Sequence, residues 1–178
     1  LTGNDSYGSV DDGGRSDVNI LLAVNPSTGK IAMVTTPRDA YINLPDYVGD
    51  GAKDKLTHVS IYGIEASMDV LGDLYGVDVD YYVRINFSGF ETIVDALGGV
   101  NVYSDKTFST TGGEYFEQGY NEVNGQQALA FVRERYAFSD GDFQRGRNQM
   151  AMISAMLDKA TSPSILMNYT GLLEAIGD

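Results

Sequence analysis

The chain has 178 residues, a formal net charge of −13 and no cysteine. This length suits one domain, and 43% hydrophobic with 21% charged residues is the composition of a folded protein rather than a disordered one. The acidic balance disfavours nucleic acid as a partner, because like charges repel at long range. Without cysteine, disulfides and thiolate metal sites are excluded, and no run approaches the roughly 18 apolar residues of a membrane-spanning helix.

The first half of the chain predicts a hairpin followed by a helix. Val18 to Val24 and Lys30 to Thr36 are runs rich in β-forming residues, and a short turn sequence separates them. Ile61 to Tyr75 carries apolar residues at helical spacing and stops before Gly76, a residue that commonly ends helices. Val77 to Ile85 alternates in the manner of a strand.

The second half predicts further helices and one strand. A helix is expected at Gly89 to Leu97, a strand at Val100 to Tyr103 and a long polar loop at Asp105 to Asn121. Two more helices are expected at Gly125 to Phe131 and Asn148 to Lys159. The order of strands and helices favours an α/β fold with a central, mostly antiparallel or mixed sheet flanked by helices.

Two charged clusters bracket the predicted hairpin. Arg15-Ser16-Asp17 precedes its first strand and Pro37-Arg38-Asp39 follows its second, so antiparallel pairing should bring them to one rim of the sheet. Asp5 is close enough in the chain to join them. Carboxylates beside arginines suit a magnesium or manganese ion and a phosphate, because the ion prefers oxygen ligands and the guanidinium matches phosphate oxygens. Ordinary rim salt bridges explain any single pair equally well.

A second group of arginines lies in the last third of the chain. If Phe131 to Tyr136 is extended, Arg133 and Arg135 point to one face and could bind a diphosphate. Arg145 and Arg147 come just ahead of the last predicted helix, whose N-terminus attracts anions. The alternative is a charged surface that serves solubility.

His58 is the only histidine and could act as a general base. A lone histidine just ahead of a helix is more often a capping or packing residue, and this is the interpretation we favour. The glycine pairs match no phosphate-binding loop, and no Gly-x-Ser-x-Gly sequence is present.

Taken together, these motifs resemble the LytR-CpsA-Psr family over nearly the whole chain. The resemblance is specific because several motifs occur in the same order at consistent spacing. The motifs are Asp5, Gly-Arg-Ser-Asp ending at Asp17, Pro-Arg-Asp at Arg38 and Asp39, Asp-Lys-Leu-Thr-His ending at His58, Asn86-Phe87, Gly98-Gly99-Val100, Ala128 to Arg135, and Gly141-Asp142 followed by Arg145 and Gln149.

The resemblance implies an α/β/α fold whose apolar pocket holds a polyprenyl chain, with arginines at the mouth binding the pyrophosphate. Asp5 and Asp17 match the positions that hold magnesium. Arg145 and Asp39 match family positions as well, whereas Asn148 stands where similar proteins often carry arginine. The residues expected to hold or support the phosphates are Arg15, Arg38, Arg133, Arg135, Arg145 and Gln149.

The resemblance also implies an activity. We expect residues 1–178 to be a single catalytic domain, a piece of a longer chain anchored by an upstream helix on the extracellular face of the cell membrane. A peptidoglycan hydroxyl would attack the phosphorus of a polyprenyl-pyrophosphate-linked glycopolymer such as teichoic acid or capsule. Arg38, Arg133 and Arg135 would stabilise the developing charge, with Asp39 a weak candidate for the base.

Three predicted helices, at Ile61 to Tyr75, Phe90 to Leu97 and Met150 to Leu157, could line the lipid pocket, although ordinary core is the commoner role for such residues. Two other functions remain open. A hydrolase would use the same site and pass the pyrophosphate to water. The other possible function is that of a non-catalytic lipid-phosphate carrier or a transcriptional regulator. The sequence shows no helix-turn-helix signal with basic recognition residues, and this argues against DNA binding.

Overall fold

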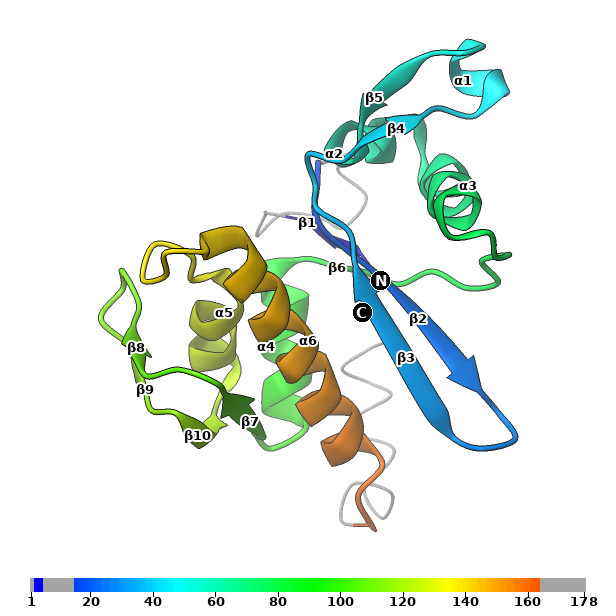
Figure 1. The fold of residues 1–178 in the computed structure, drawn as a ribbon. Coiled ribbons are helices and arrows are strands. Elements are labelled where there is room, and N and C mark those ends of the chain that lie inside the picture. The colour runs from blue at the N-terminus through cyan, green and yellow to red at the C-terminus, as the bar shows by residue number, and fades with distance from the viewer. Residues whose placement is uncertain (1, 5–14, 164–178) are drawn as a thin grey trace. The chain divides into compact units, whose positions relative to one another are not determined.

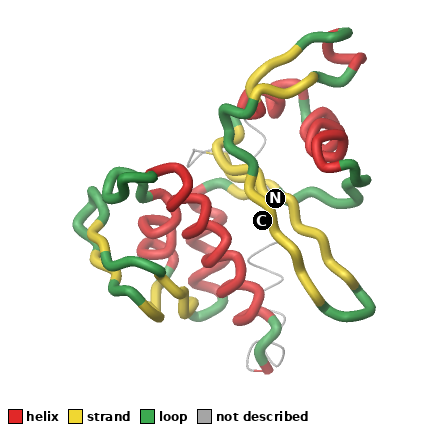
Figure 2. Tube along the Cα trace, viewed as in Figure 1, coloured by secondary structure: helices red, strands yellow, loops and turns green. Residues whose placement is uncertain are grey.

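The chain forms two units, Leu1–Phe87 and Ser88–Asp178, each with its own buried core. The computed structural model describes residues 2–4 and 15–163 (Figure 1). Figure 2 shows the long paired strands of the first unit and the helices of the second. No helix in the described part of the chain is long and apolar enough to cross a lipid bilayer.

A four-stranded sheet organises the first unit. The predicted hairpin is confirmed as β2 (Ser16–Asn25) and β3 (Lys30–Thr35), which pair antiparallel. β1 (Thr2–Asn4) pairs antiparallel with β2 and parallel with β6 (Arg84–Ile85), which gives the order β3-β2-β1-β6. The predicted mixed, mostly antiparallel sheet is therefore confirmed.

The rest of the first unit packs helices against a small hairpin. The strands β4 (Tyr41–Asn43) and β5 (Lys53–Lys55) pair antiparallel, and α1 (Asp46–Gly49) lies between them in the chain. Next come α2 (Leu56–Val59), a 3-10 turn and α3 (Ile64–Tyr75). Their shared core consists of Ile42, Leu44, Leu56, Val59, Ala66, Val70 and Leu71.

As far as residue 163, the second unit is built from three helices and two short strand pairs. Its helices are α4 (Phe87–Ala96), α5 (Gly125–Arg133) and α6 (Gly141–Ala160). Its strands pair β7 with β10 and β8 with β9; they are β7 (Val100–Ser104), β8 (Phe108–Ser109), β9 (Tyr115–Phe116) and β10 (Gly119–Val123).

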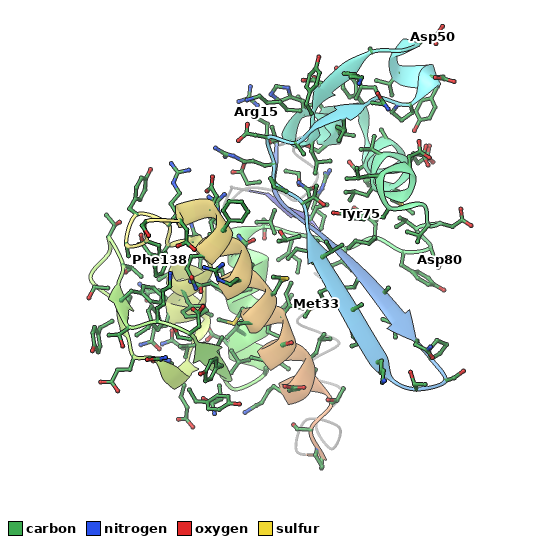
Figure 3. All side chains as sticks on the ribbon, in the orientation of Figure 1. Arg15, Met33, Asp50, Tyr75, Asp80 and Phe138 are labelled. Atoms are coloured by element: carbon green, nitrogen blue, oxygen red, sulfur yellow. The ribbon has the colours of Figure 1, made fainter. Side chains whose placement is uncertain are left out.

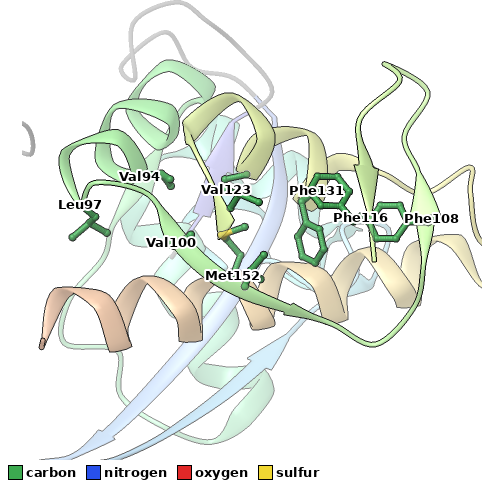
Figure 4. Packing of buried hydrophobic residues seen from close by; sticks show 10 residues of the cluster. Val94, Leu97, Val100, Phe108, Phe116, Val123, Phe131 and Met152 are labelled. Atoms are coloured by element: carbon green, nitrogen blue, oxygen red, sulfur yellow. The ribbon is translucent and has the colours of Figure 1, made fainter. Parts of the chain in front are cut away.

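The core of this unit joins aliphatic and aromatic side chains. Met152 of α6 is fully buried and points toward Val100 and Val123, which lie on the paired strands β7 and β10 (Figure 4). The rings of Phe116 and Phe131 meet edge to face, with centroids 5.1 Å apart. Burial of such side chains contributes about 1.5 to 3 kcal/mol each, so this cluster supplies much of the stability of the unit.

Several predicted boundaries were wrong. The predicted helix at residues 61–75 begins at Ile64, because Gly63 with φ of 107° separates it from the preceding 3-10 turn. The predicted strand at residues 77–85 shrinks to Arg84–Ile85, the only two residues that β1 pairs with on that side. The predicted loop at residues 105–121 contains β8, β9 and the start of β10.

The largest error concerns α6, which begins seven residues earlier than predicted. Its first turns bury Gln144 and Asn148 on the same face as Met152. These polar residues continue the buried stripe at a spacing of four, and Gln144 Nε2 donates to Asn148 Oδ1 at 3.1 Å. A search for apolar periodicity cannot detect a buried stripe made of amides.

A close approach between two helices constrains Gly125. The backbone of α5 begins against α4, and a Cβ atom added at Gly125 would lie 2.4 Å from the carbonyl oxygen of Glu91. The Gly125 amide also donates to Asp95 Oδ1 at 2.7 Å. Only glycine allows this contact without a shift of the backbone.

We predict that Gly125→Ala destabilises the second unit by about 1 to 3 kcal/mol, the usual cost of overpacking, and lowers the melting temperature by roughly 5 °C or more. Thermal unfolding followed by circular dichroism would measure the melting temperature. Gly112→Ala is the matched control, because the nearest atom to its added Cβ is 3.7 Å away. Equal melting temperatures for the two variants would contradict the packing argument.

Candidate functional site

In the first unit, the hairpin brings the two predicted charged clusters together. Asp17 lies near the start of β2, and Arg38 follows the end of β3. Arg38 Nη1 donates to Asp17 Oδ1 at 2.8 Å, with both side chains partly exposed. The predicted approach of the clusters is therefore confirmed for this pair.

Asp39 extends the cluster to a second cation. Its Oδ2 lies 3.6 Å from Arg38 Nε, and its Oδ1 accepts from Lys55 Nζ at 2.8 Å. The hydrogen bond from Lys55, followed by the charges of Lys55 and Arg38, holds the pKa of Asp39 below its usual value. The result is an alternating row of charges: Asp17, Arg38, Asp39 and Lys55.

Sequence reasoning missed Lys55. It belongs to the Asp-Lys-Leu-Thr-His motif, which was considered only for its histidine. Lys55 reaches Asp39 because the segment after β3 folds back: the amide of Leu56 donates to Ala40 O at 2.9 Å, and that of Thr57 to Arg38 O at 2.8 Å. Beyond the motif itself, the sequence carries no signal of this contact, because it depends on how the chain folds back.

His58 takes a local role, as favoured from the sequence. It lies within α2 rather than ahead of a helix, and its Nδ1 is 2.8 Å from Asp54 Oδ1. The hydrogen bond from His58, together with that from the Lys55 amide, lowers the pKa of Asp54. This pair ties β5 to α2.

Of the two residues expected to hold a metal, Asp5 and Asp17, the structure describes only Asp17. Asp5 lies outside the described residues. Asp17 presents a partly exposed carboxylate, one oxygen of which accepts from Arg38, and its role as a metal ligand stays a prediction. Within residues 2–4 and 15–163, no three His, Cys, Asp or Glu side chains gather as a metal site.

Arg15, labelled in Figure 3, is exposed at the N-terminal end of β2.

In the second unit, Arg133 and Arg135 flank the end of α5. Arg133 is the last helical residue, so the condition of an extended backbone over residues 131–136 is not met in the first half of that segment. Arg135 Nη2 donates to Tyr136 Oη at 2.7 Å, and its guanidinium lies 4.6 Å from the centre of the Tyr136 ring. Its Nη1 is 4.0 Å from Asp142 Oδ1.

Arg145 and Arg147, which were expected just ahead of the last helix, lie inside α6, and so does Gln149, as predicted. Arg145 Nη2 is 3.0 Å from Asp142 Oδ1, so Asp142 lies between Arg145 and Arg135. Gln149 is 9% exposed and donates to Val132 O at 3.3 Å. Its amide thus supports the backbone next to Arg133, a supporting role rather than a surface one.

The three helices expected to line a lipid pocket contribute to ordinary cores. Val94, Leu97 and Met152 belong to the core of the second unit, and Val70 and Leu71 to that of the first. The lipid pocket therefore stays a prediction.

A groove of about 410 Å³ lies along α3 in the first unit. Four carboxylates line it, so it repels a pyrophosphate and is not the expected lipid headgroup site. The lining residues are Glu65, Met68, Asp69, Gly72, Asp73, Gly76, Val77, Asp78 and Val79.

The model of the LytR_cpsA_psr family matches residues 1–178. The chain belongs to this family. A relative in Oceanobacillus iheyensis, the polyisoprenyl-teichoic acid–peptidoglycan teichoic acid transferase TagU, is 37% identical over 172 residues, which are 93% of this chain and 52% of the relative. The chain spans about half the length of the curated relatives it matches.

Solved structures of LytR-CpsA-Psr proteins share the fold. The crystal structure of B. subtilis TagV superposes with a TM-score of 0.83 at 26% identity, covering 99% of this chain and 69% of that one. A structure of the family protein YwtF (TagT) with bound octaprenyl pyrophosphate lipid gives a TM-score of 0.70 at 31% identity, covering 100% of this chain and 71% of that one. The predicted family and fold class are thus confirmed.

The charged row of this LytR-CpsA-Psr chain makes a prediction about proton binding. We expect Lys55→Met to raise the pKa of Asp39, because the largest stabilisation of the Asp39 carboxylate is lost. Titration of the side-chain carboxyl carbons by NMR would measure the shift. Lys30→Met, at the start of β3 beside the hairpin turn, should leave the pKa of Asp39 unchanged, and an equal shift in both variants would exclude a specific role for Lys55.

Proposed function

We propose that this chain is the catalytic part of a phosphotransferase that moves an anionic glycopolymer from a polyprenyl-pyrophosphate lipid to peptidoglycan. The observation that carries the proposal is 37% identity, over 93% and 99% of this chain, to proteins named polyisoprenyl-teichoic acid–peptidoglycan teichoic acid transferase. A family structure that holds octaprenyl pyrophosphate supports the same class of substrate.

The chemistry requires charge stabilisation more than a strong base. An acceptor hydroxyl forms a bond to the glycopolymer-side phosphorus, the bond from that phosphorus to the bridging oxygen breaks, and polyprenyl phosphate leaves. Negative charge on the phosphoryl oxygens must be matched by cations that are already in place. Arg133, Arg135 and Arg145 of the second unit are suited to this, and the first unit offers a group of its own, Arg38 and Lys55.

Asp39 fits a positioning role better than that of a base. Its carboxylate is engaged by Lys55 and Arg38, and its lowered pKa makes it a weaker proton acceptor than an ordinary aspartate. Its two contacts instead fix the distance between two cations. Arg15 and Gln149 complete the proposed set, the first as an exposed cation and the second through the Val132 carbonyl.

A magnesium ion is part of the proposal. Asp5 and Asp17 would hold it, and Asp17 offers an oxygen ligand beside a phosphate-binding arginine. When bound, the ion would neutralise phosphate charge. We further propose that the whole protein is anchored to the cell membrane and works on its extracellular face, where the lipid-linked polymer and peptidoglycan meet.

The first test is product analysis with arginine variants. We expect polyprenyl phosphate and peptidoglycan-linked polymer as products, with transfer that depends on added acceptor. Arg133→Ala and Arg135→Ala should each lower turnover roughly tenfold or more, because a charge-assisted hydrogen bond contributes about 1.5 to 3 kcal/mol.

Lysine at either position should restore only part of the activity, since it lacks the planar donor fork. Turnover within about twofold of the parent in both alanine variants, less than about 1 kcal/mol of barrier, would remove these arginines from the site. Release of polyprenyl phosphate at the same rate without acceptor would make the enzyme a hydrolase instead.

The second test concerns the metal. Replacing Asp5 and Asp17 together by alanine should abolish magnesium-stimulated turnover, whereas the melting temperature without metal should change little. Asp50→Ala, at the end of α1, is the matched control. Magnesium stimulation that persists in the double variant would show that the ion binds elsewhere.

A further inference from the structure

Glu134 is a buried carboxylate between the two arginines Arg133 and Arg135. The residue is 5% exposed. An ionised group in such a place is costly unless hydrogen bonds replace the lost water. In the sequence Glu134 lies within the Ala128 to Arg135 motif, and nothing in the proposed chemistry uses it.

Hydrogen-bond donors surround both carboxylate oxygens. Oε1 accepts from the amides of Tyr136 at 2.7 Å and Ala137 at 3.0 Å. Oε2 accepts from the amide of Thr111 at 2.8 Å and from its hydroxyl at 3.4 Å. Burial raises the pKa of Glu134, but the hydrogen bonds from the amides of Thr111, Ala137 and Tyr136 outweigh it and leave the pKa below its usual value.

These contacts join two segments that are distant in sequence. Thr111 lies in the turn between β8 and β9, while Tyr136 and Ala137 belong to the segment after α5. The Arg135 backbone is confined from a third direction, because a Cβ added at Gly141, the first residue of α6, would lie 3.0 Å from the Arg135 carbonyl oxygen. The segment that carries Arg135 is thus held between the β8–β9 turn and α6.

We propose that Glu134 is a positioning residue that fixes the backbone on either side of Arg135, and so places the guanidinium groups of Arg133 and Arg135 for one phosphate ligand. This inference rests on the proposed function. It assigns to the middle residue of the Arg-Glu-Arg sequence a task that neither arginine can perform, since both are donors only.

Glutamine cannot replace Glu134 in this role. A carboxylate offers two acceptor oxygens, one for each segment, whereas a glutamine amide offers one oxygen and one NH₂ group. In either orientation the NH₂ group faces an amide donor, of Thr111 or of Tyr136 and Ala137, and one side of the clamp is lost. The volume of the side chain hardly changes, so the substitution tests the acceptor oxygens and the charge without a change in packing.

The experiment combines amide hydrogen exchange with a double-mutant cycle. Glu134→Gln should speed exchange at Thr111, or at Tyr136 and Ala137, by roughly tenfold or more. Glu122→Gln, the same chemical change at an exposed site on β10, should leave these amides unchanged. Unchanged exchange in Glu134→Gln overturns the clamp, whether or not the protein has the proposed activity.

The cycle then asks whether Glu134 acts through Arg135. At a temperature at which all variants are folded, Glu134→Gln should lower turnover about tenfold when Arg135 is present, but about twofold or less in an Arg135→Ala background. Additive losses would mean a general structural effect and would overturn the positioning role. If Glu134→Gln does not fold, Glu134→Asp keeps the charge, shortens the side chain and gives the same comparison.

Failure of the proposed function gives a different result. In that case the parent protein itself turns over no lipid-linked polymer. The positioning role is then judged by the Nε–H resonance of Arg135 in the NMR spectrum. Broadening or a shift in Glu134→Gln but not in Glu122→Gln supports the role, and identical resonances overturn it.

Discussion

The antiparallel register of β2 and β3 is the constraint on which the charged row of the first unit depends. Ile20 lies opposite Thr35 in this pairing, and the amide of Thr36 continues it by donating to Asn19 O at 2.9 Å. A slip by one residue would turn every side chain of a strand to the other face and would separate Asp17 from Arg38. Buried Ser16, whose amide donates to Ser60 Oγ at 3.1 Å, ties the same end of the hairpin to the helical part of the unit.

That register could be predicted from the sequence, because two β-rich runs on either side of a turn leave few alternatives. The approach of Asp17 to Arg38 followed from it. The position of Lys55 could not be predicted, since it depends on backbone hydrogen bonds that join residues 38 and 40 to residues 57 and 56. Such contacts leave no periodic signal. The alternation of side chains at residues 77–83 also misled the prediction: among the described residues this segment joins no strand ladder, and Val83 O alone accepts a hydrogen bond from β1, from the Thr2 amide at 2.8 Å.

The second unit shows a different limit of prediction from the sequence. Arg133 and Arg135 were identified as candidates, but their geometry was not, because α5 runs through Arg133 and an extended backbone begins only at Glu134. The start of α6 was missed because its buried face carries Gln144 and Asn148 where the pattern requires apolar residues. Buried amides are acceptable there because each has a partner, as with Asn148 Nδ2, which donates to Phe131 O at 3.3 Å. Whether a polar side chain is buried is decided by its partners, and these come from distant parts of the chain.

The pairing of the arginines with internal carboxylates has a consequence for ligand exchange. Arg38 already contacts Asp17 and Asp39, and Arg135 and Arg145 already share Asp142. An incoming anion must therefore compete with resident carboxylates, which a simple monoanion of the medium does poorly. A ligand with several linked phosphate oxygens can engage more than one guanidinium at once and gains effective concentration from each contact after the first. The same carboxylates can return to the arginines when a bound anion leaves, so the cations are not left without a counter-charge, which favours exchange of the ligand over its tight retention.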